Sequence, residues 1–97
     1  AAAISGNMRR EQPFVFEYDR QLVQGVIDLY FIEDGQLVIV DYKTDRVLRG
    51  RAGEDELRRR YSIQLDYYAM ALSQITGLKV KEKVIYSFAL GRSLTVE

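Results

Sequence analysis

The stretch that decides the fold of this chain is GVIDLYFIEDGQLVIVDYK, residues 25–43. It contains Asp34-Gly35 between two apolar runs, a pattern typical of a β-hairpin whose two-residue turn needs a positive φ at both positions. Counting outward from that turn places Asp28 directly opposite Asp41 on the neighbouring strand. The sequence therefore predicts a hairpin in which two carboxylates face each other.

Asp28, Asp41 and Lys43 are expected on one face of this hairpin. Directly opposed residues share a face, with Cβ atoms roughly 4.5–5.5 Å apart, and Lys43 follows Asp41 by two residues. Opposed like charges destabilise a strand pair, so a cation should compensate. A divalent metal held by Asp28, Asp41 and the backbone carbonyl of Tyr42 is the natural candidate.

The amino-acid composition limits which metal or redox sites the chain can form. The 97 residues include neither cysteine nor histidine, which excludes disulfides, thiolate zinc sites, iron–sulfur clusters and histidine ligands within this chain. Oxygen ligands favour hard cations such as magnesium, manganese or calcium. No apolar run approaches the ~20 residues that span a bilayer, so we expect no membrane partner and a cytoplasmic protein. The formal net charge of zero gives no sign of a nucleic-acid binder.

Periodicity predicts one α/β domain with the order β-β-β-α-β-β. Strands are expected over residues 14–18, 22–32, 36–42, 84–90 and 93–96, with a mobile loop at 44–53 and a helix over 54–75. Residues 1–9 are interpreted as a tail or linker and residues 10–97 as the domain. Apolar residues on both faces of the hairpin indicate a sheet covered in part on each side.

The expected helix carries both a core stripe and polar residues. The stripe follows helical spacing through Leu57, Tyr61, Leu65, Tyr68, Leu72 and Ile75, and Gly77 is expected to end the helix. Acidic residues 54–56 are placed in its first turn, where they complement the helix dipole.

Gln64 and Tyr68 lie one helical turn apart and so share a face. In one interpretation both reach over the sheet and position a carboxylate, a water molecule or a DNA phosphate. In the other, backbone groups satisfy Gln64 and Tyr68 fills the core. Arg46 follows Lys43 by three residues and is the favoured phosphate contact. The run Arg58-Arg59-Arg60 on the expected helix is more typical of solvated surface charges.

The acidic pair also has two interpretations. Asp28 and Asp41 are either strand-end residues paired with Lys43, or the ligands of a magnesium ion that activates water and stabilises charge on a phosphoryl oxygen. Their apolar neighbours favour the second, because burying a charge is costly unless it is paired or metal-bound. Lys43 would then orient the water or stabilise negative charge in the transition state.

Three motifs in order resemble those of RecB-like nucleases of the PD-(D/E)XK superfamily: Gly25-Val26-Ile27-Asp28, Asp41-Tyr42-Lys43-Thr44-Asp45 and Gln64-x-x-x-Tyr68. Together with Glu11-Gln12-Pro13-Phe14 and Tyr61-x-x-Gln64-Leu65, they are similar to the C-terminal nuclease domain of the AddA family of helicase–nucleases. The resemblance covers residues 10–90. It implies a restriction-endonuclease-like core, a central mixed sheet with a flanking helix.

The resemblance also implies a function. This is exonucleolytic, magnesium- or manganese-dependent hydrolysis of DNA, fed as a single strand, in double-strand-break processing and recombinational repair beside an AddB-like partner subunit. Asp28 and Asp41 would be the metal ligands, Lys43 the catalytic lysine, and Gln64 and Tyr68 the supporting motif. ATP binding and helicase activity would belong to other segments of the full-length protein.

This chain departs from the family pattern at three points. Ile27 stands where the superfamily has proline, and no clear helix with a histidine or glutamate ligand precedes Phe14. Some relatives carry a four-cysteine iron–sulfur cluster, which this chain cannot form because it has no cysteine. We therefore expect a fragment of a larger protein that is weakly active or inactive alone. The alternatives are a non-catalytic nuclease-fold module that binds DNA or a partner subunit, and a stand-alone nuclease such as a junction resolvase.

Overall fold

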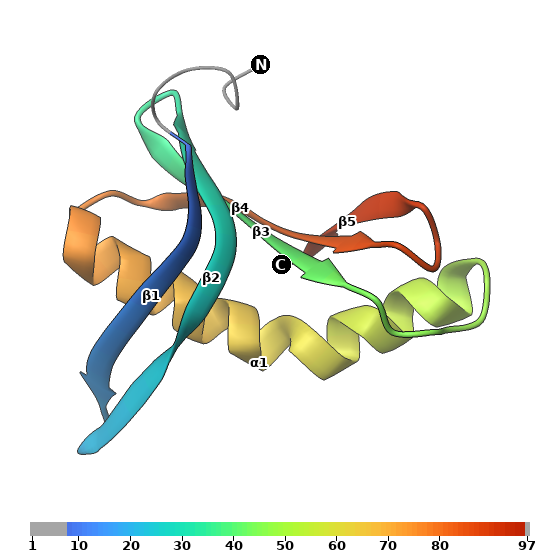
Figure 1. Cartoon of the computed structure of the whole chain (residues 1–97), viewed down its shortest axis with the longest axis horizontal. Helices are drawn as coiled ribbons and strands as arrows, with labels where there is room; N and C mark the ends of the chain where they lie inside the picture. The colour runs from blue at the N-terminus through green and yellow to red at the C-terminus, as the bar shows by residue number, and fades with distance from the viewer. Residues whose placement is uncertain (1–7, 97) are drawn as a thin grey trace.

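A computed structural model describes residues 8–96 of the chain. Five strands form one mixed sheet, and a single long helix crosses one face of it (Figure 1). The elements are β1 (Arg9–Tyr18), β2 (Gln21–Glu33), β3 (Gln36–Lys43), α1 (Arg51–Thr76), β4 (Val80–Ser87) and β5 (Arg92–Val96). The expected order and α/β class are confirmed.

The strands lie in the sheet in the order in which they occur in the chain, β1-β2-β3-β4-β5. Neighbouring strands are antiparallel except β3 and β4, which run parallel because α1 carries the chain back between them. Parallel strands require such a crossover. The carboxyl ends of β3 and β4 therefore meet at one edge of the sheet.

The hairpin of β2 and β3 has the predicted turn and register. Asp34 and Gly35 adopt φ values of 53° and 73°, as a two-residue turn of this type requires. The ladder pairs residues from Glu33 with Gln36 out to Leu29 with Val40. One further step along this register places Asp28 opposite Asp41.

The helix begins at Arg51, three residues before the expected start, and ends as predicted at Gly77. Gly77 adopts the left-handed conformation, and its N–H donates to the Ser73 carbonyl. The earlier start leaves Glu54 as the acid in the first turn, so placing all of residues 54–56 there was wrong.

The start of the helix is packed tightly against the preceding loop. A Cβ atom at Gly53 would lie 1.7 Å from the Leu48 carbonyl oxygen, so the close approach requires glycine. The side chain of Val47 also packs against the core. The end of this loop is thus packed against α1, and the mobility expected for residues 44–53 stays a prediction.

The core lies between α1 and the sheet. From the predicted stripe, Leu57, Leu65, Tyr68 and Leu72 are buried and Tyr61 packs partly against them. Ile75 is 60% exposed, so its placement in the core was wrong. Ile75 lies in the last turn of α1, which ends at Thr76, whereas Leu72 one turn earlier is fully buried; in Figure 1 this end of α1 lies to the left of the β1–β2 hairpin.

The strand after the helix spans Val80–Ser87 rather than residues 84–90. It ends at Ser87 because a turn follows, in which the Ser87 carbonyl accepts the Gly91 N–H and the Ser87 hydroxyl accepts the Leu90 N–H. Phe88 consequently leaves the sheet and is exposed.

The two faces of the sheet differ. Helix α1, the one helix among residues 8–96, covers one of them. Leu29 and Val38 are buried outside the main core, and a cover on the second face stays a prediction. Within residues 8–96, no helix is long and apolar enough to cross a membrane. Most of the tail expected at residues 1–9 falls outside the described residues, and Arg9 already belongs to β1.

Candidate active site

Asp28 on β2 and Asp41 on β3 lie next to each other on the face of the sheet that α1 covers. The Asp41 side chain is almost completely buried, with the whole residue 2% exposed. The Tyr42 backbone N–H donates to Asp28 Oδ2 at 2.9 Å and orients that carboxylate. The hairpin register thus brings the two predicted ligands together.

The Asp41 carboxylate is held in an unfavourable environment for a negative charge. Burial raises its pKa to about 6, the neighbouring Asp28 carboxylate adds to the rise, and Lys43 opposes it. Its Oδ2 atom is buried with no hydrogen-bond partner. Lys43 Nζ lies 2.8 Å from that atom as an ion pair, but not in hydrogen-bonding geometry.

Lys43 is fixed from three sides. Besides the ion pair with Asp41, its ammonium donates to Gln64 Oε1 at 3.0 Å. It also lies 4.0 Å from the centre of the Tyr61 ring, a cation–π contact. Two elements therefore hold the ammonium, β3 through Asp41 and α1 through Gln64 and Tyr61.

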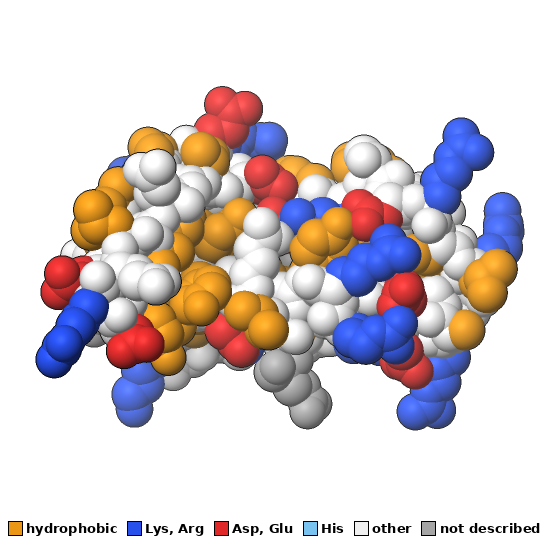
Figure 2. All heavy atoms as spheres, turned by 90° about the horizontal axis from the view of Figure 1, so that it is seen from below, with side chains coloured by type: hydrophobic (Ala, Val, Ile, Leu, Met, Phe, Trp, Pro, Cys, Tyr) orange, Lys and Arg blue, Asp and Glu red, His pale blue; other side chains and the backbone are white. Residues whose placement is uncertain are grey.

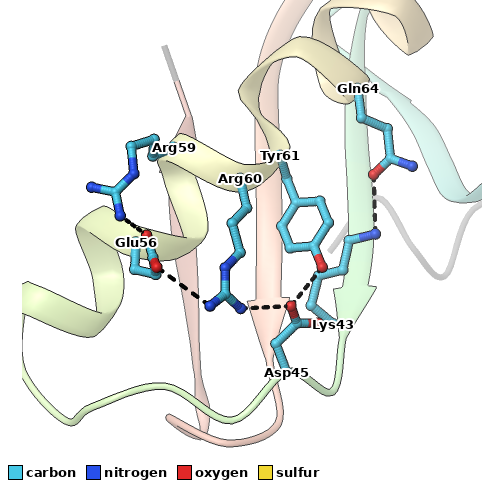
Figure 3. Close-up of polar contacts among 7 residues, drawn as sticks. All are labelled: Lys43, Asp45, Glu56, Arg59, Arg60, Tyr61 and Gln64. Carbon is cyan, nitrogen blue, oxygen red and sulfur yellow. Dashed lines mark hydrogen bonds and ion pairs between the residues drawn. The ribbon is translucent and has the colours of Figure 1, made fainter.

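Gln64 lies toward the acidic pair and Lys43, as in the first of the two interpretations that the sequence left open, and its role there stays a prediction. Its side chain turns toward Lys43 (Figure 3). Tyr68, one turn later, is buried, and its ring meets Phe14 edge to face at a centroid distance of 5.3 Å. Burial raises the pKa of Tyr68 to about 12, with further increments from the charges of Asp41 and Asp28. Tyr68 thus fills the core and adjoins the acidic pair.

Tyr61 and Asp45 are site residues that the sequence reasoning missed, because Tyr61 was assigned to the core and Asp45 was given no chemistry. The Tyr61 hydroxyl donates to Asp45 Oδ2 at 2.6 Å, and Arg60 donates to the same oxygen at 3.0 Å (Figure 3). A signal for both was available. Tyr61 precedes Gln64 by three residues and so shares its helix face, and Asp45 follows Lys43 by two.

Arg46 is not brought to the acidic pair. It is exposed and lines a pocket of about 470 Å³ with Arg59 and Arg60, between the loop and the start of α1. Figure 2, seen from the side on which α1 lies, shows basic and acidic side chains intermingled at one end of the molecule. Ion pairs such as Arg58 with Asp55 and Arg60 with Glu56 account for this mixture.

The donor set suits a hard divalent cation. Two adjoining carboxylates face a single ammonium, that of Lys43, which lies 2.8 Å from Asp41 Oδ2. When both carboxylates are ionised, one negative charge stays uncompensated, and a divalent cation would balance it. Asp28 and Asp41 remain a pair: among residues 8–96 no group of three or more acidic, histidine or cysteine side chains is placed to hold a metal. The ligand role of the Tyr42 carbonyl stays a prediction.

The chain is similar in sequence to known proteins over most of its length. The model of the PD-(D/E)XK nuclease superfamily matches residues 3–94. Proteins named as subunits of ATP-dependent helicase/nucleases are similar to the chain: that of Lachnoclostridium phytofermentans is 52% identical over 79 residues, covering 81% of this chain and 6% of the relative. That of Acetivibrio thermocellus is 53% identical over 73 residues, covering 75% and 6%. That of Thermoanaerobacter sp. is 42% identical over 105 residues, covering 93% and 8%.

The chain thus spans less than a tenth of the length of these relatives. The family match covers nearly the whole chain, and it includes the paired aspartates, the lysine and the Gln64–Tyr68 helix face described above. This chain belongs to the PD-(D/E)XK nuclease superfamily.

Proposed function

We propose that this chain is the nuclease core of a longer ATP-dependent helicase–nuclease, and that it hydrolyses phosphodiester bonds in DNA with a divalent cation. The observation that supports this most strongly is the convergence of Asp28, Asp41 and Lys43, with Lys43 Nζ 2.8 Å from a buried oxygen of Asp41. The names of the similar proteins support the helicase context.

Each residue would have a distinct role in hydrolysis. Asp28 and Asp41, with the Tyr42 carbonyl, would hold Mg²⁺ or Mn²⁺, which when bound supplies Lewis-acid stabilisation of charge on a phosphoryl oxygen. The Tyr42 N–H keeps Asp28 oriented. Lys43 would place a positive charge beside the phosphate as negative charge develops there, while Gln64 restrains the ammonium. Tyr68 would support the carboxylates from the core side.

The substrate and partners follow from the same proposal. Gln64, Tyr68 and the exposed Arg46 would contact a DNA single strand delivered by a helicase motor elsewhere in the protein. An AddB-like subunit would complete the complex, which would act as an exonuclease in recombinational repair in the bacterial cytoplasm. Residues 10–97 would form the nuclease core within that longer chain.

The 97-residue chain alone should cleave DNA weakly or not at all. Its acidic site has two carboxylates among the described residues, and most arginines near α1 are matched by acids within 4.0 Å. Phosphate contacts by unpaired basic residues supply most non-specific DNA affinity. The remainder of the native protein would provide that affinity.

Cleavage of single-stranded DNA by the native full-length protein tests the proposal. With Mg²⁺ present, Asp41→Ala and Lys43→Ala should each lower the cleavage rate by at least about 100-fold, while ATP hydrolysis continues. Asp66→Ala is a matched control, because Asp66 is an exposed acid on α1 paired with Lys83.

Two results would count against a nuclease role. If both site variants cleave DNA as fast as the control, Asp41 and Lys43 are not catalytic. If the full-length protein binds DNA equally well with and without these changes and never cleaves it, the domain is a non-catalytic binding module.

A further inference from the structure

We propose that Tyr61 is a positioning residue for Lys43, and that Asp45 holds the Tyr61 ring in place through its hydroxyl. This inference rests on the proposed function, since it assigns to two further residues the placement of the catalytic ammonium. It also assigns a role to Asp45, which is the last residue of the Asp41-Tyr42-Lys43-Thr44-Asp45 stretch and has no role in the proposed hydrolysis.

The first step of the argument is the need for restraint at Lys43. A lysine ammonium ends a flexible four-carbon stem and has three donors that rotate freely. Asp41 and Gln64 each provide one polar contact, at 2.8 and 3.0 Å. The Tyr61 ring adds a broad contact surface 4.0 Å from Nζ, and a cation–π contact strengthens as the cation loses water. The Lys43 side chain is only 16% exposed, so the ammonium is largely removed from water.

The second step is what holds the ring. Tyr61 is only partly buried, so packing alone does not fix its orientation. Its hydroxyl donates to Asp45 Oδ2 at 2.6 Å, and that oxygen also accepts from Arg60 at 3.0 Å. The hydrogen bond from Tyr61, followed by the hydrogen bond and then the charge of Arg60, lowers the pKa of Asp45. Asp45 is therefore a charged acceptor that anchors the far end of the ring.

The third step is that these contacts connect the loop after β3, through Tyr61 on α1, to the Lys43 ammonium. Figure 3 shows the side chains of Asp45, Tyr61 and Lys43 in sequence, with Gln64 on the other side of the ammonium. Arg60 links Asp45 to Glu56 on the preceding turn of α1. The loop after β3 is thereby tied to the helix at the point where the helix positions Lys43. A displaced loop would move the ring and release one side of the ammonium.

The test measures kcat and KM for single-stranded DNA with the native full-length protein and Mg²⁺. Tyr61→Leu should lower kcat by about tenfold, with KM nearly unchanged, because the ring orients the ammonium without binding DNA. Tyr67→Leu is the matched control: Tyr67 is a partly buried tyrosine on α1 that packs against Phe16 and Tyr18, away from Lys43. A kcat for Tyr61→Leu equal to that of Tyr67→Leu would overturn the inference.

Asp45 is tested by a double-mutant cycle. Asp45→Ala should lower kcat in the wild-type background, by several-fold, and should have no further effect when Tyr61 is already Leu or Phe. Asp45→Asn, which keeps a hydrogen-bond acceptor, should retain most of kcat. Equal losses from Asp45→Ala in all three backgrounds would show that Asp45 does not act through Tyr61. Tyr61→Phe preserves the packed ring, so this arm stays informative if Tyr61→Leu is poorly folded.

Failure of the proposed function would be recognised separately. If Lys43→Ala cleaves DNA at the wild-type rate, the nuclease assignment itself is wrong. If Lys43→Ala is inactive while Tyr61→Leu and Asp45→Ala match the wild type, the nuclease role stands and the positioning role falls.

Discussion

The buried Asp41 carboxylate should make the domain less stable than it would be with a neutral residue at that position. Burial raises its pKa from 3.8 to about 6, a change of about two units, and each unit corresponds to roughly 1.36 kcal/mol. Because the folded-state pKa is raised, the folded protein retains the proton longer than the unfolded chain. The stability contributed by protonated Asp41 is complete below about pH 4 and is lost as the pH rises to about 6.

Asp41→Asn isolates this effect because asparagine is neutral at every pH. Relative to the wild type, its free energy of unfolding should rise by roughly 2–2.5 kcal/mol between pH 4 and pH 7, and then stay level. Urea denaturation at five pH values without divalent cations measures the difference. The attraction of Lys43 is already included, because it contributes to the pKa of Asp41.

Asp66→Asn provides the baseline for an exposed carboxylate on the same domain, and should change the free energy of unfolding by less than about 1 kcal/mol. If the Asp41→Asn difference is the same at pH 4 and pH 7, the charged form of Asp41 carries no penalty in the folded state. The reasoning that the site lacks a positive charge would then be refuted.

Three other predictions concern the metal and the core. Calorimetry should detect Mg²⁺ binding at pH 8 that weakens at pH 5, where Asp41 is protonated, and binding that persists in Asp28→Ala would contradict the ligand assignment. Gly53→Ala should lower the free energy of unfolding by about 3 kcal/mol or more, since its Cβ would meet the Leu48 carbonyl; unchanged urea denaturation would disprove the close contact. Leu72→Ala should cost about 2–5 kcal/mol, whereas Ile75→Ala, at an exposed position, should cost under about 1 kcal/mol by the same assay; equal costs would contradict the observed packing.

Local rules were sufficient to predict the hairpin. A two-residue Asp34-Gly35 turn permits one register, and that register determines which residues oppose each other over the whole ladder. The placement of Asp28 against Asp41 followed without knowledge of any distant contact. The Gly77 helix end was predictable for a similar reason, because its left-handed conformation depends on glycine itself.

Features that depend on tertiary packing were harder to predict. Ile75 fits the helical period but is exposed in the last turn of α1, and periodicity carries no information about how far the contact with the sheet extends. The start of α1 depends on the contact between Gly53 and Leu48. The link from Asp45 to Tyr61 joins two segments that are sixteen residues apart in the sequence. Local spacing relates Tyr61 to Gln64 and Asp45 to Lys43, but it does not show that Tyr61 and Asp45 bind each other.

The most direct test of the central claim is to locate a divalent cation at the paired aspartates. Crystals of the native protein grown with Mn²⁺ should give an anomalous scattering peak within coordination distance of carboxylate oxygens from both Asp28 and Asp41, and Asp41→Asn should remove it. A peak that contacts neither residue, or no peak in crystals whose protein cleaves DNA with Mn²⁺, would contradict the assignment of this site as the nuclease metal centre.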